Sequence, residues 1–213
     1  MAYLRQRSVG MSSNFDSRYT QYQLERSPLR KWVRQLYLSR AASLVEGPTL
    51  DFGCGIGELL KKLPQGSKGL EYNAATVDYC RSQALDVSAY DGFSDNWSLT
   101  VFPAGQKFRS MVISHVLEHL ENPMMVFEKL LHAAARLDIQ RVLVIVPGQA
   151  GFRIDPTHLT FVDLQMLTDG AGLAGTGFRP MKNSYFPGDL RLIGDWFPYH
   201  ELQVLYARSP TAS

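Results

Sequence analysis

The sequence predicts an α/β fold, a three-layer sandwich in which a mostly parallel seven-stranded sheet lies between two layers of helices. Short apolar runs alternate with amphipathic stretches over most of the chain, which is typical of parallel sheets with helices on both faces. The last two apolar runs, 178–185 and 202–206, have no helical pattern between them. We therefore expect an antiparallel hairpin at the C-terminal edge of the sheet.

The first helix is expected to run from Ser27-Pro28 to near Gly47-Pro48, because serine is a good N-cap and proline suits the first helical position. Between these points Trp32, Leu36 and other apolar residues recur at helical spacing and predict a buried face. The remaining patterns predict a strand over 49–52, a helix over 56–63, a strand over 68–72, a helix over 73–83, strands over 87–90 and 110–114, a helix from 122 to about 137, a strand over 141–146 and a helix over 161–171.

The 213-residue chain fits one domain, which we place at 27–208, with a flexible arm or lid over 1–26 and a disordered tail over 209–213. Neither of the two cysteines, Cys54 and Cys80, has a metal-ligand spacing, and we predict no metal site. No signal peptide and no membrane-spanning apolar run is apparent. A cytoplasmic protein is expected.

The charge of the chain argues against a nucleic-acid partner. The formal net charge is only +2, and Lys and Arg are scattered rather than clustered. We expect a monomer or homodimer that binds a small molecule.

A glycine-rich segment, Asp51-Phe52-Gly53-Cys54-Gly55-Ile56-Gly57, follows the first predicted strand. Such a loop brings backbone N–H groups close to a ligand. A dinucleotide would require G-x-G-x-x-G, but the third glycine position is Glu58 or Leu60, depending on the register. The charge of Glu58, with Asp51 close behind, also disfavours a diphosphate. A cationic cofactor such as S-adenosylmethionine suits these carboxylates better.

The segment Leu50 to Gly57 closely resembles the first motif of class I S-adenosylmethionine-dependent methyltransferases. The segment Val112 to Leu120 is similar to the fourth-strand motif of the small-molecule enzymes of that class. The resemblance covers roughly residues 30–175, and it implies a Rossmann-like fold with S-adenosylmethionine as cofactor.

The resemblance and the spacing also indicate the cofactor-binding residues. Glu71 ends the second predicted strand, where a carboxylate accepts hydrogen bonds from ribose hydroxyls in both methyltransferases and dinucleotide enzymes. In the family, Ser114 and His115 match positions beside the methionine part, and Asp91 matches an acidic residue near the adenine. The predicted set is Asp51, Gly53, Cys54, Gly55, Gly57, Glu71, Tyr72, Asp91, Ser114 and His115.

The acceptor side of the reaction points to a histidine. An oxygen nucleophile with a high pKa needs a base, and His158 lies in the loop after strand 141–146, at the ligand-binding end of the predicted sheet. We predict that His158 positions or deprotonates the acceptor. The alternative is that His158 only caps the loop or the next helix. His119, on a short helix after the fourth strand, is expected to be structural.

Aromatic residues near both ends of the chain are candidates for enclosing the site. Tyr19 and Tyr22 precede the first helix and would belong to a lid. Five more, between or at the ends of the last two strands, form an acceptor wall or belong to the core or a dimer contact: Tyr185, Phe186, Trp196, Phe197 and Tyr199.

The leading functional prediction is O-methylation of a small molecule such as a sugar, a lipid or a secondary metabolite. The alternatives are a methyltransferase-like binding module without turnover and an NAD-dependent oxidoreductase. Methylation of nucleic acid or protein is disfavoured, because Ser114-His115-Val116-Leu117 stands where amino-nitrogen methyltransferases of the class carry an Asn-Pro-Pro-Tyr motif.

Overall fold

The computed structural model describes residues 28–103, 105–188 and 194–209. Its strands are β1 (Thr49–Phe52), β2 (Lys68–Glu71), β3 (Val87–Ala89), β4 (Ser110–Ser114), β5 (Arg141–Pro147), β6 (Phe178–Phe186) and β7 (Glu201–Arg208). Its helices are α3 (Pro28–Leu44), α4 (Ala74–Ser82), α5 (Pro123–Arg136), α6 (Gln149–Ile154), α7 (Leu164–Thr168) and α8 (Gly170–Leu173), with 3-10 turns η1 (Leu60–Lys62) and η2 (Leu117–His119). The proposed arm at 1–26, with Tyr19 and Tyr22, lies outside the described residues, as does most of the proposed tail.

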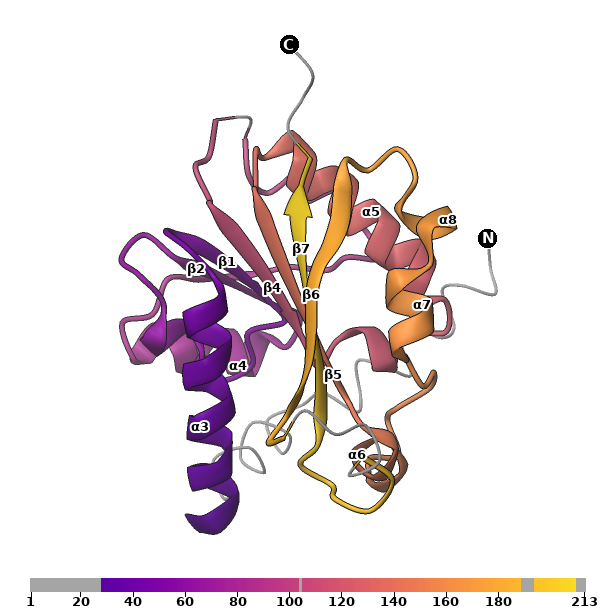
Figure 1. The fold of residues 1–213 in the computed structure, drawn as a ribbon. Coiled ribbons are helices and arrows are strands. Elements are labelled where there is room, and N and C mark those ends of the chain that lie inside the picture. The colour runs from indigo at the N-terminus through magenta and orange to yellow at the C-terminus, as the bar shows by residue number, and fades with distance from the viewer. Residues whose placement is uncertain (1–27, 104, 189–193, 210–213) are drawn as a thin grey trace, which may run out of the picture.

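The strands form one sheet in the order β3-β2-β1-β4-β5-β7-β6 (Figure 1). Strands β1 to β5 pair in parallel, and β7 runs antiparallel to both β5 and β6. The predicted α/β fold with an antiparallel C-terminal hairpin is therefore confirmed. The second strand of the hairpin, rather than the first, pairs with β5. None of the helices in the described part of the chain is long and apolar enough to cross a membrane.

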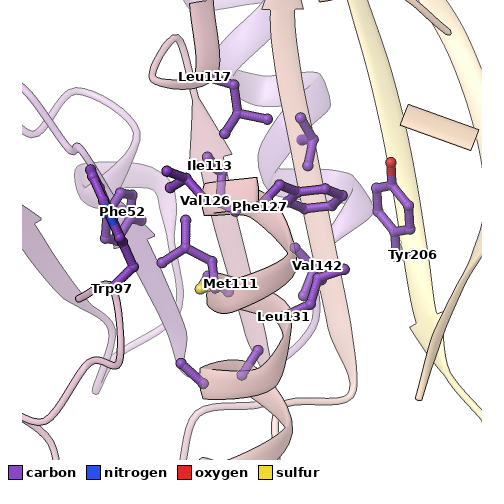
Figure 2. Close-up of a cluster of buried hydrophobic side chains, with 14 of the residues drawn as sticks. Phe52, Trp97, Met111, Ile113, Leu117, Val126, Phe127, Leu131, Val142 and Tyr206 are labelled. Carbon is purple, nitrogen blue, oxygen red and sulfur yellow. The ribbon is translucent and has the colours of Figure 1, made fainter. Parts of the chain in front are cut away.

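Alternate residues of the central strands pack against opposite helix layers, as the two-residue repeat of a strand requires. On one face, Val142 of β5 and Tyr206 of β7 join a cluster with Phe127 and Leu131 of α5 (Figure 2). On the other face, Ile145 and other strand residues pack against α3. The seven-residue apolar strand β5 is buried on both faces, so it forms the centre of the core.

The apolar stripe of α3 differs from the prediction. Trp32 is 62% exposed and Leu36 is 45% exposed, whereas Leu38 and Ala41 are buried. The N-terminal half of α3 extends past the ends of β1 and β2 (Figure 1), and Val33 is the apolar residue of this half that still packs against the core. The buried side chains that the structure describes lie in the C-terminal half of α3.

Two predicted helices were wrong in extent. No α-helix forms over 56–63, because Gly57 has a φ of +74° and too few residues remain before Pro64; only η1 is present. The helix expected over 161–171 begins at Leu164, where Asp163 caps it by accepting a hydrogen bond from Met166 N, and it is interrupted before α8. The short helix α6 lies where a loop was expected.

Candidate functional site

A cavity of about 310 Å³ lies at the carboxyl ends of the parallel strands. Ligands in open α/β sheets bind at this end, near the point where the strand order reverses, here between β1 and β4. Nine predicted site residues line it, namely Asp51, Gly53, Cys54, Gly55, Glu71, Tyr72, Ser114, His115 and His158. Gly57 and Asp91 are not among the lining residues.

The glycine loop turns sharply between β1 and β2. The backbone N–H groups of Gly53 and Cys54 both donate to the carbonyl of Leu70, at 2.8 and 3.0 Å. Gly53 has a φ of +72°, and a Cβ atom there would lie 2.4 Å from Cγ2 of Val116. Only glycine meets both conditions, so this position lets the loop pack closely against Val116 in its present conformation.

Glu71 joins the loop to the second strand. Its Oε2 accepts a hydrogen bond from Gly55 N and its Oε1 accepts one from Asn73 N, each at 2.9 Å. Burial raises the pKa of Glu71, and these backbone donors offset part of that rise. Each carboxylate oxygen can accept a further hydrogen bond, so Glu71 can still receive the hydroxyls of a ribose.

Asp51 is a buried carboxylate that faces the cavity. It is 2% exposed, and its Oδ2 has no hydrogen-bond partner among the described residues. Burial raises the pKa of Asp51 to about 7, with Arg34 opposing the rise and Glu71 adding to it. An unpartnered buried carboxylate is costly unless a ligand satisfies it. The carboxylates of Asp51 and Glu71 therefore fit a ligand with a cationic group.

Arg34 of α3 lines the cavity and forms an ion pair with Glu58. Arg34 therefore neutralises the charge of Glu58, and this charge alone does not exclude a diphosphate. A diphosphate usually sits at a helix N-terminus, and residues 53–59 form turns with no α-helix after them.

His115 is held between two carboxylates. Its Nδ1 lies 3.1 Å from Oε1 of Glu118, and its Nε2 lies 3.1 Å from Oε1 of Glu201. Burial lowers the pKa of His115, but the two carboxylates outweigh burial and raise it to about 9. His115 therefore places a positive charge on the cavity wall near neutral pH. Glu201, on β7, was not predicted from the sequence.

His158 also lines the cavity, on the other side of Glu118 from His115, and is largely buried. Its Nδ1 lies 2.9 Å from the carbonyl oxygen of Phe152, and the two rings stack with centroids 5.3 Å apart. Because a carbonyl only accepts, the neutral imidazole carries its proton on Nδ1 and its lone pair on Nε2. Nε2 lies 3.9 Å from both Glu118 Oε1 and Asp155 Oδ2. The contact with Phe152 fits the structural alternative, and the lone pair fits the role of a base.

Three aromatic residues that the sequence analysis missed also line the cavity: Tyr90, Phe93 and Trp97. They lie in or next to the segment 91–109, for which the sequence predicted neither a helix nor a strand. The hydroxyl of Tyr90 donates to Asp95 at 2.6 Å and accepts from Leu99 N at 3.2 Å, which holds this segment in place. An aromatic cluster directly after a strand was the available signal.

Asp91 is exposed, and its Oδ1 accepts a hydrogen bond from Phe93 N at 3.0 Å. It therefore supports the backbone next to the aromatic residues instead of facing the cavity.

The C-terminal aromatic residues are divided between the site, the core and the surface. Tyr199 lines the cavity, and Phe186 packs against Tyr37 in the core. Trp196 is 88% exposed, so it does not belong to the core of this chain. The expected acceptor wall is therefore limited to Tyr199 among the five.

A family model described as a methyltransferase domain matches residues 21–163. Among curated proteins, none matches the chain. A solved structure of an S-adenosylmethionine-dependent methyltransferase from Archaeoglobus fulgidus is 21% identical, covers 83% of this chain and 93% of its own, and superposes with a TM-score of 0.63.

Magnesium protoporphyrin IX methyltransferase from Synechocystis PCC 6803, solved with bound SAH, is 14% identical over 95% of this chain and 100% of its own, with a TM-score of 0.67. The [4+2]-cyclase SpnF is 16% identical over 87% of this chain and 83% of its own, with a TM-score of 0.55. At these identities the solved structures establish a common fold.

Proposed function

The chain belongs to the methyltransferase-domain family, and from this premise we propose that it transfers the methyl group of S-adenosylmethionine to an oxygen of a small molecule. The observation that carries the proposal is the buried Asp51 carboxylate, whose Oδ2 has no partner among the described residues. It lines the cavity beside the glycine loop. The ammonium group of a cationic cofactor would satisfy it.

The proposed cofactor site extends from Asp51 to the aromatic segment after β3. Glu71 accepts the ribose hydroxyls, and Tyr90 and Trp97 offer ring faces to the adenine. The proposed cofactor-binding set is Asp51, Gly53, Cys54, Gly55, Gly57, Glu71, Tyr72, Asp91, Ser114 and His115. Gly57 and Asp91 contribute indirectly, by shaping the loop and by holding the backbone of Phe93.

When bound, S-adenosylmethionine supplies a methyl group that its positive sulfur already activates. The residues of the chain must then align the acceptor oxygen and exclude water. The Nε2 lone pair of His158 can accept the proton of an acceptor hydroxyl, and Glu118, 3.9 Å away, would stabilise the resulting imidazolium. If His158→Ala retained turnover within about threefold of wild type, His158 would have no part in proton transfer.

The cavity favours a small acceptor. The acceptor would share the cavity of about 310 Å³ with the cofactor, which leaves little room for a large molecule. Ile154, 62% exposed, and Tyr199 contribute apolar surface to the lining, which suits a sugar, a lipid or an aromatic secondary metabolite. The absence of a nucleic-acid partner, the cytoplasmic location and a monomeric or homodimeric state stay predictions.

A second candidate is a member that binds the cofactor without methyl transfer. The [4+2]-cyclase SpnF has the same fold, so the fold alone does not require methylation. An NAD-dependent oxidoreductase is less favoured, because the glycine loop runs into turns and not into an α-helix whose N-terminus could hold a diphosphate.

Calorimetric titrations with S-adenosylmethionine, S-adenosylhomocysteine and NAD test the proposed cofactor. The proposal expects both sulfur compounds to bind at one site per chain, and binding of NAD alone would contradict it. A screen of hydroxylated acceptors with methyl-labelled S-adenosylmethionine then separates an enzyme from a binding module.

A further inference from the structure

Three side chains with metal-binding atoms meet beside the cavity, although the sequence predicted no metal. Glu118 and His119 lie on η2, and His158 lies 39 residues further along the chain, after α6. One ligand atom from each lies within 4.8 Å of the others. Backbone hydrogen bonds hold the segment of His158 next to η2, because Leu159 N and Thr160 N both donate to the carbonyl of Glu118, at 2.8 and 3.1 Å.

The two imidazoles are oriented as metal ligands commonly are. In metal sites, one ring nitrogen donates to a carbonyl or carboxylate, which fixes the tautomer and directs the other nitrogen to the ion. Nδ1 of His158 lies 2.9 Å from the carbonyl oxygen of Phe152, and Nδ1 of His119 lies 3.2 Å from that of Thr157. Both rings therefore have their lone pair on Nε2.

Glu118 supplies an independent observation. It is fully buried, and its Oε2 has no hydrogen-bond partner among the described residues. Its other oxygen accepts from His115 and lies 3.9 Å from Nε2 of His158. A buried carboxylate oxygen without a donor is expensive, and a cation next to the two imidazoles would satisfy it.

The surrounding charge also favours a cation. Besides Glu118, the carboxylate of Asp155 lies 3.9 Å from Nε2 of His158, and Glu201 lies behind His115. Three carboxylates are thus connected through these rings, and the imidazole of His115 bridges two of them, Glu118 and Glu201.

We propose that Glu118, His119 and His158 bind one divalent transition-metal ion on the wall of the cavity. Two imidazoles and one carboxylate suit zinc, manganese or iron better than magnesium. His119, His158 and Asp155 line the cavity, so the open positions of the ion would face the ligand. The ligand atoms must move closer by about 1 Å or more to reach normal coordination distances of about 2.0–2.2 Å.

The role of this ion rests on the proposed function, although its binding does not. An acceptor with a hydroxyl or carbonyl oxygen would bind at the open positions, and the ion would lower the pKa of a bound hydroxyl. A nitrogen that binds the ion cannot also accept a proton. His158 would then act as a ligand and not as the base considered above.

The test uses Co²⁺ as the probe, since its visible absorption reports coordination by nitrogen and oxygen. The full-length protein is stripped with a chelator and titrated with Co²⁺, and binding of Zn²⁺ is measured by calorimetry. We expect one ion per chain and a loss of affinity of about tenfold or more in His158→Ala and in His119→Ala. His132→Ala, which removes an exposed histidine of α5, is the matched control and should bind as wild type does.

Two further measurements keep the result unambiguous. Circular dichroism checks that each variant is folded, and S-adenosylmethionine binding to the wild-type protein is measured separately; Glu118→Gln is not used alone, because it also removes a partner of His115. Wild-type protein that binds no Co²⁺, or folded variants of both histidines that bind it undiminished, would overturn the metal site. If S-adenosylmethionine still binds in those cases, the proposed function stands; if the ion binds and S-adenosylmethionine does not, the metal site stands and the proposed function fails.

Discussion

His115 and Glu201 are joined across the sheet, with Nε2 of the histidine 3.1 Å from Oε1 of the glutamate. Strand β5 lies between the strands that carry them. The same imidazole also contacts Glu118. One ring therefore connects the antiparallel strand β7 to the cavity wall, and β7 takes part in building the site as well as closing the core.

Glu201→Gln tests how much this connection stabilises the fold. Gln keeps the shape but removes a charge from a nearly buried ion pair, which costs on the order of 1–3 kcal/mol. We expect the melting temperature to fall by roughly 3–10 °C. Thermal unfolding followed by circular dichroism measures the change.

The matched control for this variant is Glu128→Gln. Glu128 pairs with His132 on the surface of α5, where the side chains are 46% and 53% exposed. Exposed pairs contribute little, so its melting temperature should stay within about 2 °C of wild type. An equal fall in both variants would mean that the buried pair has no special role.

Gly53→Ala tests the shape of the loop. An alanine there combines a left-handed backbone, with φ +72°, and a contact of 2.4 Å with Val116. We expect affinity for S-adenosylmethionine to fall at least tenfold, since strain of about 1–3 kcal/mol falls on the binding loop. Calorimetry measures the affinity, and adding Val116→Ala should recover part of it.

Gly105→Ala is the control for a glycine of positive φ that does not line the cavity. Gly105 also has a positive φ, of +98°, but a Cβ atom there would meet nothing within 4 Å. This variant should bind S-adenosylmethionine as wild type does. If Gly53→Ala bound S-adenosylmethionine as well as the Gly105→Ala control does, the conformation of the glycine loop would not determine the affinity.

Asp51→Asn should stabilise the protein without ligand at neutral and higher pH. Burial raises the pKa of Asp51 to about 7 from its ordinary 3.8. Between these values the folded state holds a proton that the unfolded state has released, so the free energy of unfolding falls as the pH rises toward 7. Asparagine avoids this loss.

Melting curves from pH 4 to pH 8 measure the effect. The variant should melt roughly 5 °C above wild type at the upper end, and the difference should vanish as the pH falls toward 4. Asp78→Asn, which removes an exposed carboxylate of α4, controls for the change in net charge. A variant that is less stable than wild type at pH 8 would show that the carboxylate of Asp51 is partnered.

The sequence predicted the sheet and the glycine loop because both depend on local patterns. The structures of β5 and of the glycine loop after β1 are determined by residues that are close together in the sequence. The helix expected over 56–63 failed because Gly57 adopts a conformation that a helix excludes. Hydrophobic periodicity alone does not report that conformation.

The rest of the site depends on contacts between distant segments. Glu201 reaches His115 only because β7 pairs with β5 in a register set by seven residue pairs. Glu118 and His158 meet because the chain returns along η2 after α6. Tyr90, Phe93 and Trp97 face the cavity because side-chain hydrogen bonds hold the segment after β3. No spacing pattern in the sequence alone predicts these contacts.

The central claim, that the cavity binds S-adenosylmethionine through carboxylates at both ends, is tested most directly with two ligands and two variants. 5′-Methylthioadenosine shares the adenosine part but lacks the amino-acid part. By calorimetry, Asp51→Asn should lose at least tenfold in affinity for S-adenosylmethionine and nothing for 5′-methylthioadenosine, whereas Glu71→Gln should lose affinity for both by a similar factor. Unchanged binding of S-adenosylmethionine to Asp51→Asn, or no binding of it to the wild-type protein, would contradict the account.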